Sequence, residues 1–125
     1  MGETKRVLIV DDHLAMRRAV IRVLESQPNI EVCGEAENGR IAIDQAQKLK
    51  PDLIVLDLSM PVMNGLEAAR ILHAMMPNTP ILMYTSFATS NLAEEALAAG
   101  VTRVSTKSNP PALIADLQML LKDAA

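Results

Sequence analysis

Four short runs, three of them apolar throughout and one half polar, each end on polar side chains, and this pattern limits the fold more than any other feature of the sequence. An apolar run of this length beside turn residues is typical of a strand buried on both faces of a parallel sheet. A charge in the middle of such a strand would be costly to desolvate, so the polar residues belong at the carboxyl end. The runs with their polar ends are residues 7–10 with Asp11 and Asp12, 53–56 with Asp57, 81–84 with Thr85 and Ser86, and 101–106 with Lys107. The sequence therefore predicts three carboxylates, a hydroxyl and a cation at one edge of a sheet.

Helical segments are predicted between these runs, because apolar residues recur there at helical spacing or follow capping residues. The first helix is expected over residues 13–26, and the second opens at Asn38 and Gly39 and reaches Leu49. The third is capped by Asn64. Asn91 repeats that cap spacing for a fourth helix ending at Gly100, and a fifth starts at Asn109 and Pro110.

Five strands alternating with five helices predict an α/β fold with a doubly wound parallel sheet. Residues 30–36 alternate apolar and polar side chains, and residues 101–106 are also half polar, so these two strands belong at the edges. The flavodoxin-like order 2-1-3-4-5 satisfies this requirement. It places the switch point between the first and third strands, where ligands bind in such sheets. Asp11, Asp12 and Asp57 would then lie side by side in the crevice.

The composition predicts one domain over residues 1–125 with a substantial apolar core, because half of the residues are hydrophobic. A net charge of −3 and 2% aromatic residues argue against direct binding of nucleic acid or of an anionic membrane. Residues 1–6 are polar, no apolar run approaches about 18 residues, and Cys33 is the only cysteine. We therefore expect a cytoplasmic location.

Three carboxylates in one crevice repel one another unless a proton or a cation compensates them. Oxygen ligands of this kind suit Mg²⁺, and an aspartate can act as a nucleophile toward phosphorus. Lys107 could then neutralise a phosphoryl oxygen, and Thr85 could donate a hydroxyl hydrogen bond. Taken singly, each residue has an ordinary interpretation, such as a solvated lysine, a strand-end hydroxyl or a helix cap. His13 is interpreted as a residue of the first helical turn rather than a ligand. A site is indicated because four strand ends all carry residues suited to the same chemistry.

The sequence resembles the receiver domain of two-component response regulators at residues 10–13, 56–65 and 84–86 and at Lys107. The resemblance covers roughly residues 5–122 and implies a switch that catalyses its own phosphorylation and dephosphorylation and is not a turnover enzyme. It implies a role for each matching residue: Asp57 as phosphoacceptor, Asp12, Asp57 and the Ser59 main-chain carbonyl as Mg²⁺ ligands, Asp11 as a ligand through water, and Thr85 and Lys107 as phosphoryl-binding groups.

The resemblance also implies partners. The phosphoryl donor would be a sensor histidine kinase or a phosphotransfer protein, and the switch would act on an output domain or effector protein. A homodimer could form through the fourth helix, the fifth strand and the fifth helix. Asp11-Asp12-His13 and residues 34–39 are similar to receivers that precede a helix-turn-helix domain, which would imply transcription regulation.

Two positions depart from the family pattern. Val104 stands where an aromatic residue usually precedes the lysine by three positions, and Ser108 stands where many members have proline. Because Val104 is small and stiff, Phe87 is predicted to be the large group that changes exposure on phosphorylation.

Two other classes of protein would use a similar strand-end site or fold. A phosphohydrolase of haloacid dehalogenase type would need a second acid two residues after the nucleophile, where Ser59 stands. A flavodoxin-like module would bind the phosphate of flavin mononucleotide after the first strand, where Asp11 and Asp12 would repel it, and aromatic side chains to hold the ring are scarce.

Overall fold

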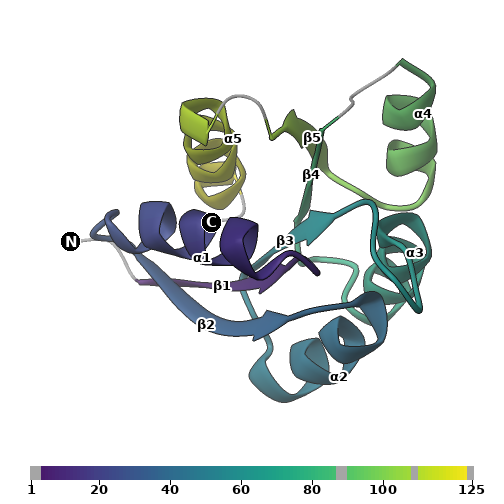
Figure 1. Ribbon diagram of the computed structural model, residues 1–125, viewed down its shortest axis with the longest axis horizontal. Coiled ribbons are helices and arrows are strands. Elements are labelled where there is room, and N and C mark those ends of the chain that lie inside the picture. The colour runs from purple at the N-terminus through teal and green to yellow at the C-terminus, as the bar shows by residue number, and fades with distance from the viewer. Residues whose placement is uncertain (1–3, 87–89, 108–109, 124–125) are drawn as a thin grey trace.

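The structure of the chain, a computed structural model, describes residues 4–86, 90–107 and 110–123. A single parallel sheet of five strands forms its centre, in the order β2-β1-β3-β4-β5, and the chain alternates strand and helix along the described residues (Figure 1). The strands are β1 (Lys5–Val10), β2 (Ile30–Ala36), β3 (Leu53–Asp57), β4 (Ile81–Thr85) and β5 (Arg103–Thr106). The helices are α1 (Leu14–Glu25), α2 (Gly39–Leu49), α3 (Gly65–Met75), α4 (Ser90–Ala98) and α5 (Pro110–Asp123). The predicted fold class and strand order are confirmed.

Helices cover both faces of the sheet (Figure 1). α1 and α5 pack on one face, around Val7, Val55 and Tyr84. α2, α3 and α4 pack on the other, around Leu8, Ile54 and other apolar strand residues. Because both faces are covered, every residue of β3 and β4 is buried, which explains their uninterrupted apolar sequences. The edge strands β2 and β5 keep some exposed residues, as the polar residues within them predicted.

Side-chain caps at α2 and α3 confirm two of the predicted helix starts. Asn38 Oδ1 accepts a hydrogen bond from the Ile41 N–H at 2.9 Å, and Asn64 Oδ1 accepts one from the Glu67 N–H at 3.0 Å. Each cap satisfies an amide that has no partner within its helix. Gly100 follows α4 with φ +98°, in agreement with its predicted role after a helix end.

Three predicted boundaries need correction. α1 begins at Leu14, and His13 stands outside it as the N-cap residue. α4 begins at Ser90, so Asn91 lies within its first turn and is not its cap. β5 begins at Arg103, because Val101 and Thr102 belong to the connection from α4. Short polar residues favour helix starts generally, so neighbouring candidates are hard to tell apart from spacing alone.

The alternation predicted for β2 is interrupted in the middle of the strand. Val7 pairs with Val32 and Leu8 pairs with Gly34, so the register between β1 and β2 skips Cys33. Such a bulge shifts the side chains that follow it by one position. Glu31 and Glu35 are exposed on either side of the bulge, and the residues between them are half-buried.

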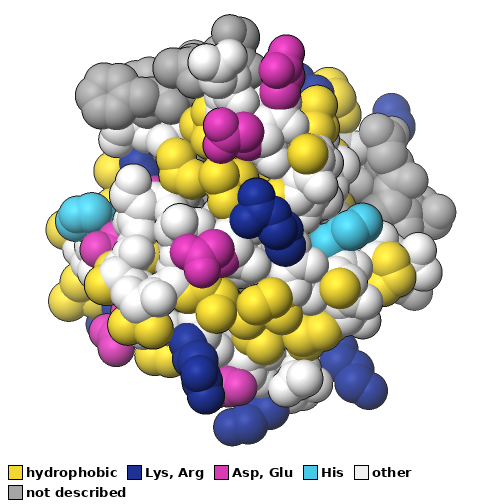
Figure 2. Space-filling model, turned by 90° about the vertical axis from the view of Figure 1, so that its right-hand side faces the viewer, with side chains coloured by type: hydrophobic (Ala, Val, Ile, Leu, Met, Phe, Trp, Pro, Cys, Tyr) yellow, Lys and Arg dark blue, Asp and Glu magenta, His cyan; other side chains and the backbone are white. Residues whose placement is uncertain are grey.

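The face formed around α3 and α4 shows hydrophobic side chains in groups between charged ones (Figure 2). Among the described residues of the molecule, the large hydrophobic side chains with substantial exposure are Leu14, Val23, Val62, Ile71, Leu97 and Met119. They belong to four helices and one loop, and Val62 in the β3–α3 loop is the most exposed of them, at 80%.

Candidate functional site

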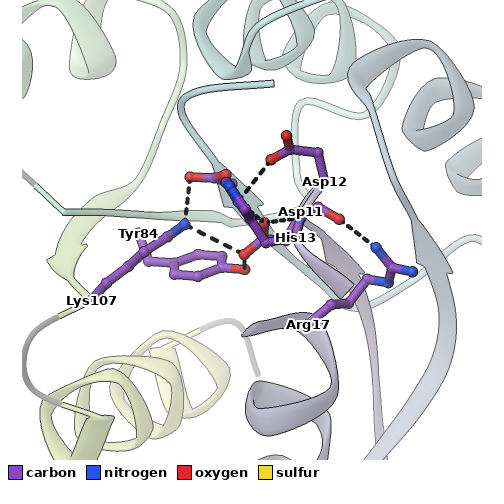
Figure 3. A network of polar contacts seen from close by, with 7 residues as sticks. Asp11, Asp12, His13, Arg17, Tyr84 and Lys107 are labelled. Carbon is purple, nitrogen blue, oxygen red and sulfur yellow. Dashed lines mark hydrogen bonds and ion pairs between the residues drawn. The ribbon is translucent and has the colours of Figure 1, made fainter. Parts of the chain in front are cut away.

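The candidate site lies at the carboxyl ends of β1, β3, β4 and β5. Asp11 and Asp12 follow β1, Asp57 ends β3, Thr85 ends β4, and Lys107 follows β5. β1 and β3 are neighbours in the sheet although a helix, a strand and a second helix separate them in the chain. The structure therefore brings the three predicted carboxylates and the predicted cation into one group, and Figure 3 shows several of these side chains pointing toward one another.

Asp57 is held against Lys107. The Lys107 Nζ lies 3.1 Å from Asp57 Oδ1, and the two side chains are only 11% and 3% exposed, so water screens this ion pair weakly. The Lys107 amide donates to the Thr85 carbonyl at 2.8 Å, which ties the ends of β4 and β5 together. Thr85 itself is buried, and it pairs across the sheet with Thr106, the residue before Lys107.

Asp11 is completely buried, and both of its oxygens contact protein groups. Oδ1 accepts a hydrogen bond from the His13 amide at 2.8 Å. Oδ2 accepts one from the Tyr84 hydroxyl at 2.5 Å and lies 3.4 Å from the Lys107 Nζ. Burial raises the pKa of Asp11, but the Tyr84, His13 and Lys107 contacts outweigh it and lower the pKa overall. Asp11 is thus an ionised and oriented carboxylate within the protein.

Asp57 has the opposite balance. Burial raises its pKa, the hydrogen bond from Lys107 lowers it, and the nearby charges of Asp11 and Asp12 raise it further, so that the pKa lies above its ordinary value. Asp57 Oδ2 is buried and has no hydrogen-bond partner among the described residues. A buried carboxylate oxygen without a donor is unfavourable in the protein alone. Its ionised form would be stabilised by an additional cation.

The acidic group fits a metal ion. Asp11, Asp12, His13 and Asp57 can each bring one ligand atom to within 4.8 Å of the others. Asp12 Oδ1 is buried without a hydrogen bond from any residue that the structure describes, although the exposed His13 ring places its Nδ1 3.1 Å away. Asp12 and Asp57 therefore each keep one oxygen available, whereas both oxygens of Asp11 are occupied. Carboxylate oxygens are the donors that Mg²⁺ takes in proteins, so the residues present fit that ion.

Ser59, the remaining predicted ligand, stands two residues after Asp57 in the β3–α3 loop. This loop also holds Val62 at φ +70°, with the Met63 amide donating to the Pro61 carbonyl at 2.7 Å. Phe87, predicted to change exposure, lies outside the described residues. Val104 is half-buried and packs against the core formed with α2, α3 and α4.

Two residues that shape the site were not singled out from the sequence. Tyr84 reaches Asp11 from within β4, and its ring lies under the Lys107 Nζ at 4.9 Å from the ring centroid (Figure 3). Arg17 on α1 donates to the Asp11 carbonyl at 2.6 Å and pairs with Glu35 at 2.8 Å. By sequence pattern, Arg17 is a charged residue of the first helix and Tyr84 belongs to an apolar strand, and neither position indicates a role in the site.

Comparison with known proteins agrees with this geometry. The family model of the response regulator receiver domain matches residues 7–118. The chain belongs to this family of two-component signalling proteins, and the phosphohydrolase and flavodoxin-like alternatives are not favoured.

Curated relatives are longer proteins. A protein-glutamate methylesterase/protein-glutamine glutaminase of Alkalilimnicola ehrlichii is 46% identical over 99 residues, which is 78% of this chain and 25% of that protein. Its counterpart in Pyrococcus horikoshii is 43% identical over 86 residues, 69% of this chain and 23% of that protein. The chain thus spans about a quarter of the length of these relatives.

Solved structures of receivers superpose on almost the whole chain. The response regulator domain of Thermotoga maritima CheB gives a TM-score of 0.89 at 31% identity and covers 96% of this chain and 98% of that one. A LuxR-family response regulator of Aurantimonas sp. SI85-9A1 gives 0.93 at 31% identity, with coverage of 97% and 87%. Along the described residues, we find no helix long and apolar enough to cross a membrane.

Proposed function

We propose that Asp57 is the phosphoacceptor of this receiver, and that residues 1–125 act as one phosphorylation-controlled domain. The observation that carries the proposal is the state of Asp57: one oxygen is paired with Lys107, and the other is buried without a partner among the described residues. A carboxylate with a free oxygen beside a positive charge is suited to attack phosphorus, because phosphoryl transfer depends mainly on positioning and charge neutralisation.

The donor is a phosphohistidine on a sensor histidine kinase or a phosphotransfer protein. An Asp57 oxygen forms the new bond to phosphorus as the bond from phosphorus to the histidine nitrogen breaks, and the nitrogen keeps the electron pair. Lys107 contacts a phosphoryl oxygen through its ammonium group, and Thr85 donates its hydroxyl to another. Hydrolysis of the acyl phosphate returns Asp57 to its starting state, so that the domain is a switch rather than a turnover enzyme.

Mg²⁺ is the metal of this site. Asp12, Asp57 and the Ser59 main-chain carbonyl would hold the ion, with Asp11 acting through water. The contacts within the described part of the chain support this division, since Asp12 keeps a buried oxygen without a hydrogen bond there and both Asp11 oxygens are occupied. The ion would neutralise charge on the phosphoryl oxygens.

The output is a domain or effector protein that reads the surface of α4, β5 and α5, and a homodimer could use the same surface. Leu97 on α4 and Met119 on α5 are exposed apolar groups there. The relatives include methylesterase proteins and LuxR-family regulators, so a catalytic domain or a transcription-regulating domain are the two outputs that the comparisons support. Nucleic acid and membranes are not direct partners of this domain, which acts in the cytoplasm.

The experiment is incubation with acetyl phosphate, with Mg²⁺ or with EDTA, followed by intact-mass measurement. The wild-type protein should gain the mass of one phosphoryl group with Mg²⁺ and none in EDTA. Asp57→Asn should gain none, while Asp52→Asn, which changes an exposed aspartate at the opposite end of β3, should behave as the wild type. A phosphoryl adduct on Asp57→Asn, or equal labelling in EDTA, would refute the assignment.

A further inference from the structure

We propose that Tyr84 is a positioning residue of the phosphoryl-transfer site. Its hydroxyl holds the Asp11 carboxylate in place for the metal, and its ring supports the ammonium of Lys107. The inference rests on the proposed function and adds to it a residue that touches neither the metal nor the phosphoryl group directly.

The hydrogen-bonded pair of Tyr84 and Asp11 is buried. Tyr84 is 1% exposed and Asp11 is fully buried, so bulk solvent competes little for the hydrogen bond between them. The hydroxyl lies 2.5 Å from Asp11 Oδ2, a charge-assisted hydrogen bond between β4 and the end of β1. Such a bond fixes the direction in which a buried carboxylate points. Figure 3 shows the Tyr84 side chain reaching Asp11 from the same side as Lys107.

The ammonium of Lys107 lies close to two carboxylates at once. Its Nζ lies 3.1 Å from Asp57 Oδ1 and 3.4 Å from Asp11 Oδ2. Without the Tyr84 hydroxyl, Oδ2 of Asp11 would depend on Lys107 alone among the described residues. Because the hydroxyl donates to Asp11 Oδ2, Lys107 can pair with Asp57, and later with a phosphoryl oxygen, while the buried Asp11 oxygen keeps a hydrogen bond.

The aromatic ring of Tyr84 contacts the cation of the site. The Lys107 ammonium lies 4.9 Å from the centroid of the Tyr84 ring, within the range of a cation–π contact. The ring thus places the cation above a buried, rigid side chain of β4, next to Thr85. Tyr84→Phe removes the hydroxyl and keeps this contact, so the two contributions can be measured separately.

The test is a calorimetric titration with Mg²⁺ of the wild type, Tyr84→Phe, Asp11→Asn and the double variant. Partners of metal-ligating groups typically contribute about 10–100-fold to metal affinity, and we expect Tyr84→Phe to weaken Mg²⁺ binding by about tenfold. In the Asp11→Asn background, the same change should weaken binding by less than about twofold, because the hydroxyl acts through the Asp11 carboxylate. Thermal melts of each variant confirm that the titrated protein is folded.

Ser105→Ala is the matched control. Ser105 pairs with Tyr84 across β4 and β5, is 4% exposed, and has an Oγ without a hydrogen-bond partner among the described residues. Removing this buried hydroxyl should leave Mg²⁺ affinity unchanged. Equal losses in Ser105→Ala and Tyr84→Phe would show a general packing effect and would overturn the proposal.

A spectroscopic measurement separates positioning from packing. Tyr84 is the only tyrosine and the chain has no tryptophan, so the near-ultraviolet spectrum reports the environment of this one phenol. Asp11→Asn should shift that spectrum, because the hydroxyl loses an anionic acceptor, and Ser105→Ala should not reproduce the shift.

Wild-type Mg²⁺ affinity in Tyr84→Phe, or a spectrum unaffected by Asp11→Asn, would overturn the role of Tyr84 and leave the proposed function standing. Absence of Mg²⁺ binding by the wild-type protein would instead overturn the proposed function, and the role of Tyr84 with it.

Discussion

The two ends of the sheet differ in how far their polar groups are paired by hydrogen bonds. At the amino ends of the strands, the Arg6 amide donates to Asp52 Oδ2 at 2.8 Å, and the Asp52 amide donates to the Arg6 carbonyl at 2.7 Å. The Arg6 guanidinium donates to the Leu49 carbonyl at the end of α2. The Ile81 amide donates to Thr102 Oγ1 at 3.1 Å. Each of these contacts joins elements that are distant in the chain.

At the carboxyl ends, Asp11 and Asp57 share the ammonium of Lys107, and Asp12 lies beside the ring of His13. Asp57 Oδ2 and Asp12 Oδ1 are buried and accept no hydrogen bond from the described residues, and the charges of Asp11 and Asp12 raise the pKa of Asp57. The difference teaches that the amino end of the sheet stabilises the fold, whereas the carboxyl end keeps unsatisfied polar groups, as the proposed metal and phosphoryl site requires. Local conflict of this kind is expected at functional sites.

The largest effect should come from filling the space between α3 and Asp57. A Cβ at Gly65 would lie 2.3 Å from the Asp57 carbonyl oxygen, which is backbone and cannot move aside without moving the strand. We expect Gly65→Ala to lower the free energy of unfolding by about 1–3 kcal/mol, as overpacking does. It should also reduce phosphoryl acceptance at temperatures where the protein remains folded. Urea melts and intact-mass labelling measure the two effects.

Gly100→Ala is the comparison variant at the other end of the sheet. Gly100 has φ +98°, and a Cβ there would lie 2.4 Å from His73 Cγ, so stability should fall here too. Labelling of the folded protein should stay at the wild-type level, because no site residue is near. Equal loss of labelling in both variants would contradict the division between the two ends.

A smaller effect is expected from Asp52→Ala. This change removes the acceptor of the Arg6 amide and should lower the free energy of unfolding by about 1 kcal/mol, the usual contribution of one hydrogen bond. Asp52→Asn keeps an acceptor oxygen and should lose less. The measurement is urea denaturation in EDTA. Unchanged or increased stability of Asp52→Ala would show that the amino end is not the better satisfied one.

The sequence was sufficient to predict the sheet and most of the site. The uninterrupted apolar runs before Asp57 and Thr85 and the half-polar strands at residues 30–36 and 101–106 determine which strands lie inside and which lie at the edges. Once the order is known, parallel strands bring Asp11 and Asp57 together at one edge. Lys107 follows from the same rule, since it comes directly after a strand.

Features that depend on tertiary contacts were beyond the sequence. Tyr84 is an apolar strand residue by pattern, and only the packed sheet shows that its hydroxyl meets Asp11. Val62 adopts φ +70°, which β-branched residues rarely do, so no residue preference could indicate it. The register skip at Cys33 adjoins Gly34, and a glycine inside a strand suggests a bulge without determining its position. The metal ligands, the phosphoacceptor and the partners remain predictions that the experiments above test.

The most direct test of the account is thermal unfolding of the wild type and Asp57→Asn at neutral pH, in EDTA and with Mg²⁺. Because the folded protein raises the pKa of Asp57, ionisation of this group costs stability as the pH rises through that pKa. In EDTA we expect Asp57→Asn to be more stable by about 0.5–2 kcal/mol, the range of stabilising substitutions at strained functional sites.

The gain should shrink below the ordinary pKa of 3.8, where Asp57 is protonated in both the folded and the unfolded state. Mg²⁺ should raise the melting temperature of the wild type and raise that of Asp57→Asn less, since ligand binding to the folded state stabilises it. If Asp57→Asn melts below the wild type in EDTA at neutral pH, the carboxylate is structurally satisfied and the account is contradicted.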